Sequence, residues 1–329
     1  MPKTLQLFQR KFTVAGSDSD DYYRAFQSGG NVTDSVLLAI RPFVGDDAVC
    51  LDVGANIGLY SLALASVASR GKVYAFEPSP ATFDYLRRNV EDNGLANVES
   101  FKLAVGDQAE GTVHFHDIPF FSAGSFAAED GSFLTSEVLG SNYFEAPATT
   151  LDAFVAENGI DRVDLIKIDV EGAELSVLEG ATETLSSMQP KVALEFNSFG
   201  FTLHQGILPQ DALARIRAIF PYVYVMHRGD GSLGLLTAEL TYAFLYDNGI
   251  RGPVDNLLCS FQDLGIRRSY VPLAVAESIA ADSGDAQPPP PTELDAMRST
   301  LSWRITAPLR TVRTRLEPLA QRLAGLRRR

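Results

Sequence analysis

Residues 49–58 read Val-Cys-Leu-Asp-Val-Gly-Ala-Asn-Ile-Gly, an apolar run that leads into a turn with two glycines. The run has the composition of a buried strand, and an amphipathic helical pattern follows it over about residues 57–69. A second apolar run, residues 72–76, ends at Glu77. Strand, glycine turn, helix, strand and acid form the first half of a nucleotide-type binding unit. The sequence therefore predicts an α/β fold with a mostly parallel central sheet and a ligand site at this turn.

The spacing of the glycines restricts the ligand. A dinucleotide fingerprint is G-x-G-x-x-G, whereas this turn has Gly54 and Gly58 only, with Asp52 before them and Asn56 between them. The Gly-Lys-Ser/Thr ending of a P-loop is absent, and a carboxylate at position 52 would repel a pyrophosphate. Glu77 lies 19 residues after Gly58, near the spacing of about 20 that is typical of a carboxylate on ribose hydroxyls. A ligand with ribose, positive charge and no phosphate points to S-adenosylmethionine, and a nicotinamide dehydrogenase is the alternative for this segment.

A second group of acids follows a strand predicted over residues 163–168. Asp169 ends that strand, where ligands bind in open α/β sheets, and Glu171 and Glu174 come directly after it. Glu174 is equally well explained as a residue of a helix N-terminus, because the helix dipole favours acids there. Lys167 has an apolar neighbour on each side and is expected either to pair with one of these acids or to reach solvent.

The remaining pattern alternates helices and strands. We expect helices over residues 32–44, 80–93, 174–187 and 209–220, a short helix from Thr150, and strands over 97–105, 113–116, 191–196, 222–226 and 241–246. Residues 1–31 show little periodicity, and residues 118–146 are rich in Gly, Ser and Phe, which indicates an irregular insertion or lid.

Composition limits the class of protein. A chain of 329 residues with 46% hydrophobic residues can form one large α/β domain or two small ones. No apolar stretch approaches the roughly 20 residues of a membrane span, and the first residues lack the pattern of a secretory signal. Cys50 and Cys259 are the only cysteines, and Cys50 lies inside the first apolar strand. We therefore expect no disulfide framework, no cysteine metal site and a cytoplasmic location.

Charge is distributed unevenly along the chain. Residues 298–329 contain nine arginines and one acid, Glu317, for a net charge of +8. Subtracting these from the totals of 28 basic and 41 acidic residues leaves 19 and 40, a net charge of −21. An acidic body argues against a nucleic-acid substrate, because phosphate contacts need a basic face.

The basic tail has the pattern of an amphipathic helix. Its apolar residues recur every three or four positions at Leu309, Val312, Leu316, Leu319, Leu323 and Leu326. Trp303 lies at the start of the tail, and Pro318 is expected to kink or divide the helix. Such a segment is typical of a helix at a membrane surface, and residues 302–310 also resemble tails of bacterial polysaccharide-assembly glycosyltransferases. Packing on the acidic body or on a partner helix is the alternative.

Four blocks occur in a characteristic order: L-D-V-G-A-N-I-G-L-Y-S from Leu51, F-E-P from Phe76, L-I-K-I-D-V-E-G-A-E from Leu165 and A-L-E-F from Ala193. Over about residues 45–250 the chain resembles the FkbM family of S-adenosylmethionine-dependent methyltransferases. The resemblance implies the class I methyltransferase (Rossmann-like) fold, a seven-stranded, mostly parallel sheet with helices on both faces and the last strand antiparallel. Family members are mostly O-methyltransferases of hydroxyls on sugars, polysaccharides and macrolides.

The resemblance also assigns binding residues. The methionine part of the cofactor should lie against Asp52, Gly54, Asn56 and Gly58. Glu77 should hold the ribose with Pro78 beside it, the segment from Ala104 and Val105 to Asp107 should lie beside the adenine, and Asp169 is counted among the cofactor contacts as well. The implied domains are a helical lead-in (1–44), a methyltransferase domain (45–275), a disordered Pro-rich linker (276–297) and the basic tail (298–329).

Methylation of a sugar hydroxyl benefits from a base that takes its proton, which contributes about 10²–10⁴-fold. Asp169 is the first candidate for this base, followed by Glu195 and His204. No resident metal is predicted, but a divalent cation on Asp169, Glu171 and Glu195 is an alternative way to bind the hydroxyl. The function expected is an O-methyltransferase of a polysaccharide or lipid-linked glycan. A methyltransferase of a macrolide or other secondary metabolite and a non-catalytic scaffold of a glycan-assembly complex are the alternatives.

Overall fold

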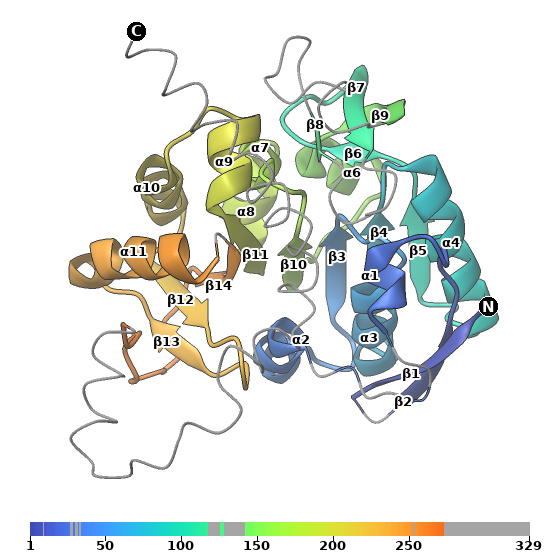
Figure 1. Cartoon of the computed structure of the whole chain (residues 1–329), viewed down its shortest axis with the longest axis horizontal. Coiled ribbons are helices and arrows are strands. Elements are labelled where there is room, and N and C mark those ends of the chain that lie inside the picture. Colours follow the sequence, from blue (N-terminus) through green and yellow to red (C-terminus); the bar gives the residue numbers. More distant parts are fainter. Residues whose placement is uncertain are drawn as a thin grey trace, which may run out of the picture.

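The computed structural model describes residues 1–8, 10–26, 29, 32, 34–117, 126–127, 142–252 and 254–272. Within these ranges the central sheet has eight strands (Figure 1). They are β3 (Val49–Val53), β4 (Lys72–Phe76), β5 (Val98–Phe101), β10 (Leu165–Ile168), β11 (Lys191–Asn197), β12 (Tyr222–Met226), β13 (Leu233–Leu235) and β14 (Val254–Ser260). The predicted linker and basic tail lie outside the described residues, as does most of the predicted insertion.

The strand order is β13-β12-β14-β11-β10-β3-β4-β5. Strands β5, β4, β3, β10 and β11 pair in parallel, and β14 is antiparallel to both of its neighbours. This confirms the class I methyltransferase sheet, and β13 adds an eighth strand at the edge. The chain proceeds outward from β3 in one direction and from β10 in the other, so their carboxyl ends form the switch point where such sheets bind ligands.

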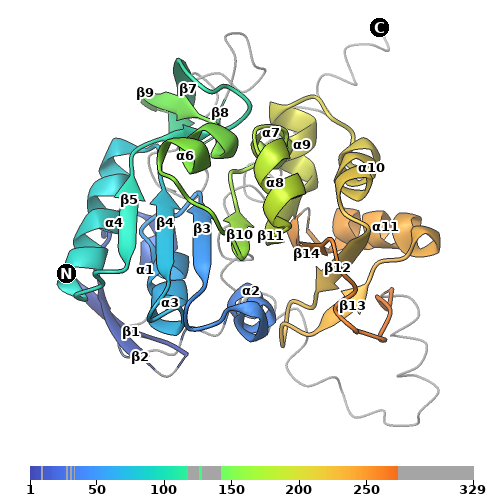
Figure 2. The same ribbon diagram turned by 180° about the vertical axis from the view of Figure 1, so that it is seen from behind.

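Helices cover both faces of the sheet (Figures 1 and 2). They are α2 (Ser35–Ile40), α3 (Leu59–Val67) and α4 (Pro80–Asp92) on one face, and α6 (Leu151–Glu157), α7 (Glu174–Glu179), α8 (Thr182–Met188), α9 (Ser198–His204), α10 (Pro209–Ile219) and α11 (Thr241–Arg251) on the other. Successive residues of β3 serve different faces, since Cys50 belongs to the first apolar core and Leu51 to the second. Burial raises the pKa of the Cys50 thiol to about 12, as expected for a core residue.

Two predicted elements near the C-terminal half are wrong. Residues 241–246 form part of helix α11, because Phe244 and Asn248 are buried while Tyr242 and Tyr246 are exposed, a helical period. The antiparallel strand is β14 instead. The helix predicted over residues 174–187 is divided into α7 and α8 at Gly180, where a Cβ would lie 1.9 Å from the carbonyl oxygen of Gly106.

The lead-in expected to be helical begins with a β-hairpin. Strands β1 (Lys3–Leu7) and β2 (Arg10–Val14) pair antiparallel and precede the short helix α1 (Asp21–Arg24). The hairpin buries alternate residues, Leu5 and Leu7 on one strand and Phe12 and Val14 on the other. The helix expected at residues 32–44 is confirmed in a shorter form, as α2 followed by the 3₁₀ turn Arg41–Phe43.

A small second sheet lies beside the carboxyl ends of β4 and β5. Its strands are β6 (Ala104–Val105), β7 (Thr112–Asp117), β8 (Phe126–Ala127) and β9 (Asn142–Thr149). The single strand predicted over residues 97–105 is therefore two strands in two sheets, while the strand predicted at 113–116 is confirmed. Among the described residues no helix has the length and apolarity to cross a membrane.

Candidate active site

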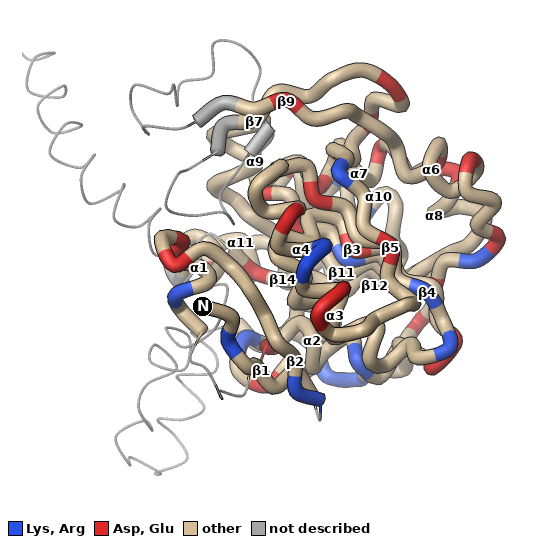
Figure 3. Tube along the Cα trace, turned by 90° about the vertical axis from the view of Figure 1, so that its right-hand side faces the viewer, with Lys and Arg blue, Asp and Glu red and all other residues tan. Residues whose placement is uncertain are grey.

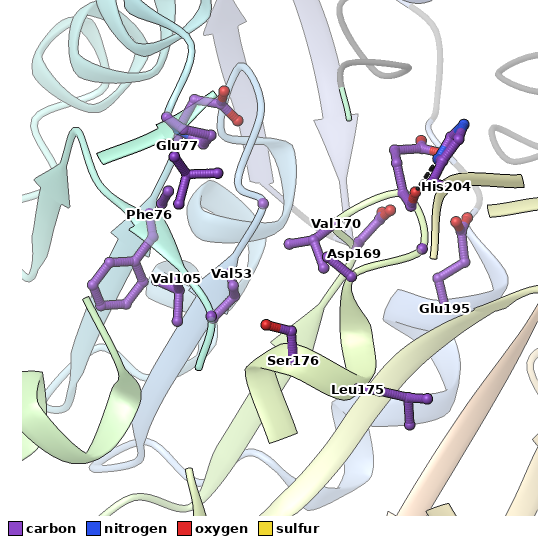
Figure 4. A pocket seen from close by; sticks show the side chains of 18 of the residues that line it. Val53, Phe76, Glu77, Val105, Asp169, Val170, Leu175, Ser176, Glu195 and His204 are labelled. Atoms are coloured by element: carbon purple, nitrogen blue, oxygen red, sulfur yellow. Dashed lines mark hydrogen bonds between the residues drawn. The ribbon is translucent and has the colours of Figure 1, made fainter. Parts of the chain in front are cut away.

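A cavity of about 720 Å³ opens at the carboxyl ends of β3, β4, β10 and β11 (Figure 4). This volume lies within the range of small-molecule sites. Glu77 and Val105 line one end, and Asp169, Glu195 and His204 line the other. The cavity thus joins the two motifs that the sequence singled out.

The glycine turn between β3 and α3 forms the floor. Gly54 has φ +76°, and a Cβ on it would lie 1.8 Å from the carbonyl oxygen of Asp169, so the position excludes any side chain. Asn56 also has positive φ, +51°, and its Oδ1 accepts a hydrogen bond from Ile57 N at 2.7 Å. Gly54 and Asn56 line the cavity as predicted, whereas Gly58 lies at the start of α3, packed against Leu86 and outside the cavity wall.

Glu77 closes one end of the turn. Its Oε2 accepts from the backbone N–H of Asn56 and its Oε1 from that of Ser79, both at 2.9 Å. Two backbone donors hold the carboxylate in the orientation seen in Figure 4. This arrangement suits the two neighbouring hydroxyls of a ribose.

Asp52 does not occupy its expected place on the cavity wall. It is completely buried behind the turn, where Ser61 Oγ donates to its Oδ2 at 2.5 Å and Lys167 Nζ lies 3.7 Å from its Oδ1. Burial raises the pKa of Asp52, and the Lys167 ammonium and the Ser61 hydroxyl oppose that shift. Asp52 therefore supports the glycine turn from the side of the core, because the alternation of side chains along β3 points its carboxylate into the core.

The wall beside Glu77 contains Pro78, Ala104 and Val105, as the family resemblance implied. Asp107 continues this wall, and its Oδ1 accepts a hydrogen bond from Ser176 Oγ at 2.9 Å. Ser176 belongs to α7, and the sequence pattern gave no reason to choose it. A flat ligand in this region would lie between the apolar side chains of Ala104 and Val105 and the polar side chains of Asp107 and Ser176.

The other end of the cavity is acidic. Carboxylate oxygens of Asp169, Glu171 and Glu195 lie within 4.8 Å of one another. Asn197 Nδ2 donates to Glu171 Oε2 at 3.2 Å and to Glu195 Oε2 at 3.3 Å, so one amide links two acids. Burial, followed by the charge of Asp169, raises the pKa of both Glu171 and Glu195 well above the usual value.

Lys167 pairs with the acids and does not reach solvent. Its Nζ lies 3.2 Å from Asp169 Oδ2 and donates to the Gly54 carbonyl at 3.2 Å. Burial lowers the pKa of this ammonium, but Asp169 and then Asp52 outweigh that effect and the net shift is upward. A charged lysine thus connects the glycine turn to the strand end that bears Asp169.

Glu174 acts within its own loop. It is completely buried, and its Oε1 accepts from the backbone N–H groups of Val170 and Gly172 at 3.2 and 3.1 Å. Burial raises its pKa to about 7. The bonds organise the loop between Asp169 and α7. Glu174 also lies in the first turn of α7, as the helix-terminus interpretation expected, but both of these bonds are to residues that precede that helix.

His204 lies across the cavity from Glu77 on α9, a helix that the sequence did not predict. Its Nδ1 lies 2.9 Å from the Glu171 carbonyl oxygen (Figure 4). Burial lowers the pKa of His204, so the ring is neutral near pH 7. His114 also lines the cavity, but it is half exposed and lies 3.4 Å from Glu145, as suits a residue at the rim.

The sequence patterns missed the cavity wall that comes from the N-terminal segment. Tyr22, Asp34 and Ser35 line the cavity together with Tyr60 of α3. Tyr22 belongs to a helix of four residues, too short for a periodic signal. Asp34 is the N-cap of α2, and a cap and a ligand contact use the same residue type, so its position in the sequence does not reveal the cavity.

A family model described as the methyltransferase FkbM domain matches residues 52–222. The chain belongs to this family. It is a methyltransferase with the class I fold, in agreement with the strand order and with the position of the cavity at the switch point.

Three curated relatives show the range of this family. NoeI of Sinorhizobium fredii, a 2-O-methyltransferase, is 29% identical over 232 residues, which cover 66% of this chain and 92% of NoeI. AglP of Haloferax volcanii, a hexuronic acid methyltransferase, is 29% identical and covers 50% of this chain and 60% of its own. The 31-O-demethyl-FK506 methyltransferase FkbM of Streptomyces tacrolimicus is 31% identical, with 44% and 62% covered. Among solved structures, a SAM dependent methyltransferase from Aquifex aeolicus matches with a TM-score of 0.37 and 15% identity, covering 75% of this chain and all of that one.

Proposed function

We propose that the protein is an S-adenosylmethionine-dependent O-methyltransferase that acts on a hydroxyl of a sugar in a polysaccharide or lipid-linked glycan. The observation that carries the proposal is a single cavity with a carboxylate suited to ribose at one end and acid and imidazole groups at the other. A nucleoside donor and a hydroxyl acceptor both fit this division.

The residues present fit the proposed donor. Glu77 faces the cavity with its carboxylate held by Asn56 N and Ser79 N, and Gly54 lines the cavity between Glu77 and Asp169. The donor, when bound, supplies a methyl carbon activated by a sulfonium. A sulfonium and an ammonium are compatible with the acidic end, whereas a pyrophosphate is not.

Asp169 is the proposed acceptor of the hydroxyl proton. Its side chain is 31% exposed, and Lys167 holds its Oδ2 at 3.2 Å. Placing a hydroxyl in line with the methyl carbon supplies much of the rate enhancement in such a displacement. Glu195 and the neutral His204 border the same space and remain the second and third candidates for the base.

A divalent cation is the alternative means of activating the hydroxyl. Asp169, Glu171 and Glu195 offer oxygen ligands of the kind that Mg²⁺ and Ca²⁺ prefer. Treatment with EDTA separates the two mechanisms: loss of turnover that Mg²⁺ restores supports the cation, and unchanged turnover supports the base.

The acceptor class is supported by AglP, a hexuronic acid methyltransferase, by NoeI, a 2-O-methyltransferase, and by the acidic, polar end of the cavity. The direct test incubates the protein and S-adenosylmethionine with fractionated glycan extracts and measures S-adenosylhomocysteine release. Mass spectrometry then identifies the sugar that gains one methyl group. Turnover on a macrolide panel with none on any glycan would favour the secondary-metabolite alternative, and S-adenosylhomocysteine binding without turnover would favour the scaffold alternative.

The location proposed is cytoplasmic, at the inner face of a membrane where lipid-linked glycans are assembled. Support comes from the basic amphipathic pattern of residues 298–329. Sedimentation with vesicles that contain anionic lipids tests it, with a chain ending at Ser283 as the control. Equal sedimentation of both chains contradicts the proposal.

A further inference from the structure

The N-terminal segment completes the cavity although it precedes the residues matched by the family model. That match begins at residue 52, whereas Tyr22, Asp34, Ser35 and Val36 all line the cavity. The segment therefore brings side chains to the site that the family motifs do not supply.

Asn89 of α4 and Asn93, the C-cap residue of this helix, fix the segment in place, and the hairpin lies beside the helix in Figure 3. Asn93 Oδ1 accepts from Thr13 N at 2.8 Å, and its Nδ2 donates to Thr13 O at 2.7 Å. Asn89 makes the same pair of bonds with Ala15, at 2.6 and 2.9 Å, and also donates to the Ile57 carbonyl at 2.8 Å. One side chain thus connects the N-terminal segment to the glycine turn.

Asp34 presents a carboxylate to the cavity. It is 6% exposed, and all three hydrogen bonds that the structure gives this carboxylate go to Oδ1. The donors are Val36 N at 2.9 Å, Leu37 N at 3.0 Å and Tyr60 Oη at 2.9 Å. Among the described residues, Oδ2 is left with no hydrogen-bond donor, on a buried residue that lines the cavity.

A chain of contacts locates Asp34 relative to the turn. Its partner Tyr60 has a ring whose centroid lies 4.5 Å from Lys167 Nζ, and Lys167 donates to the Gly54 carbonyl. Glu77 contacts the turn through Asn56 N. Because ribose joins the adenine to the methionine chain in S-adenosylmethionine, a ribose at Glu77 directs the methionine chain toward the Gly54 carbonyl, Tyr60 and Asp34.

The charge of the site indicates which group Asp34 meets. Burial raises the pKa of Asp34, because the ionised form loses contact with water. A bound cation would compensate this loss, while a neutral hydroxyl would compensate it less. The methionine chain carries an ammonium, the one cationic donor on this ligand.

We propose that Asp34 binds the ammonium of the methionine portion of S-adenosylmethionine through Oδ2, while Oδ1 caps α2. The inference rests on the proposed donor. It makes the N-terminal segment part of the cofactor site and not only a cover for it.

The test is Asp34→Asn, because asparagine caps helices as well as aspartate does and keeps the bonds to Oδ1. Calorimetry should show an affinity for S-adenosylhomocysteine that is about 10–100-fold lower, as for loss of a hydrogen bond to a charged group. Binding of 5′-methylthioadenosine, which lacks the amino acid portion, should be unchanged. Asp20→Asn is the matched control, since Asp20 is also a buried acid that caps a backbone N–H, that of Tyr22, but lies outside the cavity wall.

Equal loss of affinity for both ligands would mean that Asp34 acts only on the fold, and unchanged affinity for both would also overturn the inference. Asp34→Ser, which keeps a capping residue without a carboxylate, serves if the asparagine variant does not fold. A wild-type protein that binds neither ligand would instead reject the proposed donor.

Discussion

The two ends of the cavity are built in different ways. At the nucleoside end, backbone N–H groups hold the carboxylate of Glu77. At the acceptor end, side chains hold one another: Lys167 pairs with Asp169, and Asn197 links Glu171 to Glu195. Geometry at the first end is therefore fixed by the fold, whereas geometry and charge at the second depend on protonation.

The largest effect is expected where the two ends meet. Gly54→Ala places a Cβ against the Asp169 carbonyl at a positive φ. We therefore expect the free energy of unfolding to fall by more than about 3 kcal/mol, and cofactor binding to be lost with it. Gly94→Ala is the control, because Gly94 also has positive φ, +63°, but has no atom within 4 Å of the added Cβ. The Gly94 variant should lower the free energy of unfolding, measured by chemical denaturation, by only about 1–2 kcal/mol. Similar losses in both variants would contradict the close contact.

Asp169→Asn tests the acceptor end. Turnover should fall by about 10²–10⁴-fold, because the variant cannot take the proton of the hydroxyl. Calorimetric affinity for S-adenosylhomocysteine should be retained, since Glu77 and the turn are unchanged. Full activity in this variant would remove Asp169 from the mechanism and leave Glu195 and His204.

Glu77→Ala tests the nucleoside end. Affinity for S-adenosylhomocysteine should fall about 10–100-fold as charge-assisted hydrogen bonds to the ribose are lost. Glu99→Ala is the control, because Glu99 is a half-exposed acid whose partner Lys72 lies 2.5 Å away on the neighbouring strand β4. Unchanged calorimetric affinity in the Glu77 variant would contradict the ribose assignment.

The smallest effect is expected on the pH dependence of stability. A raised pKa means that Glu195 retains a proton in the folded protein that it releases in the unfolded chain. This residue therefore makes folding less favourable as the pH rises above the pKa that Glu195 has in the unfolded chain. Glu195→Gln should therefore raise the melting temperature at pH 8 by about 2–4 °C and leave it nearly unchanged at pH 4. Glu77→Gln should lower the melting temperature at pH 4 and at pH 8, because an amide cannot accept hydrogen bonds from Asn56 N and Ser79 N together. Equal shifts for the two variants would show that the ends do not differ as described.

Local sequence patterns predicted the parts of the site that lie within one turn of the chain. Gly54 and Glu77 follow buried strands, and Asp169 ends another, so their places follow from strand order alone. Asp52 was misplaced because the motif does not say which face of the strand it occupies. Tyr22 and Asp34 reach the cavity through the contacts of a distant hairpin with α4, and no local period carries that information. Helix α11 was taken for a strand because residues 241–246 read Thr-Tyr-Ala-Phe-Leu-Tyr, a short apolar run that fits a strand or a helix until the burial of each residue is known.

Asn89 ties the N-terminal segment to the methyltransferase domain. Its amide bonds both Ala15 and the Ile57 carbonyl, so the hairpin and the glycine turn share one anchor. The match to the family model begins at residue 52, whereas the hairpin whose following residue bonds to Asn89 begins at Lys3. A chain shortened to begin at β3 would keep every motif and lose the wall of the binding site that Tyr22, Asp34 and Ser35 supply. Ligand binding should in turn protect the first forty residues from proteases.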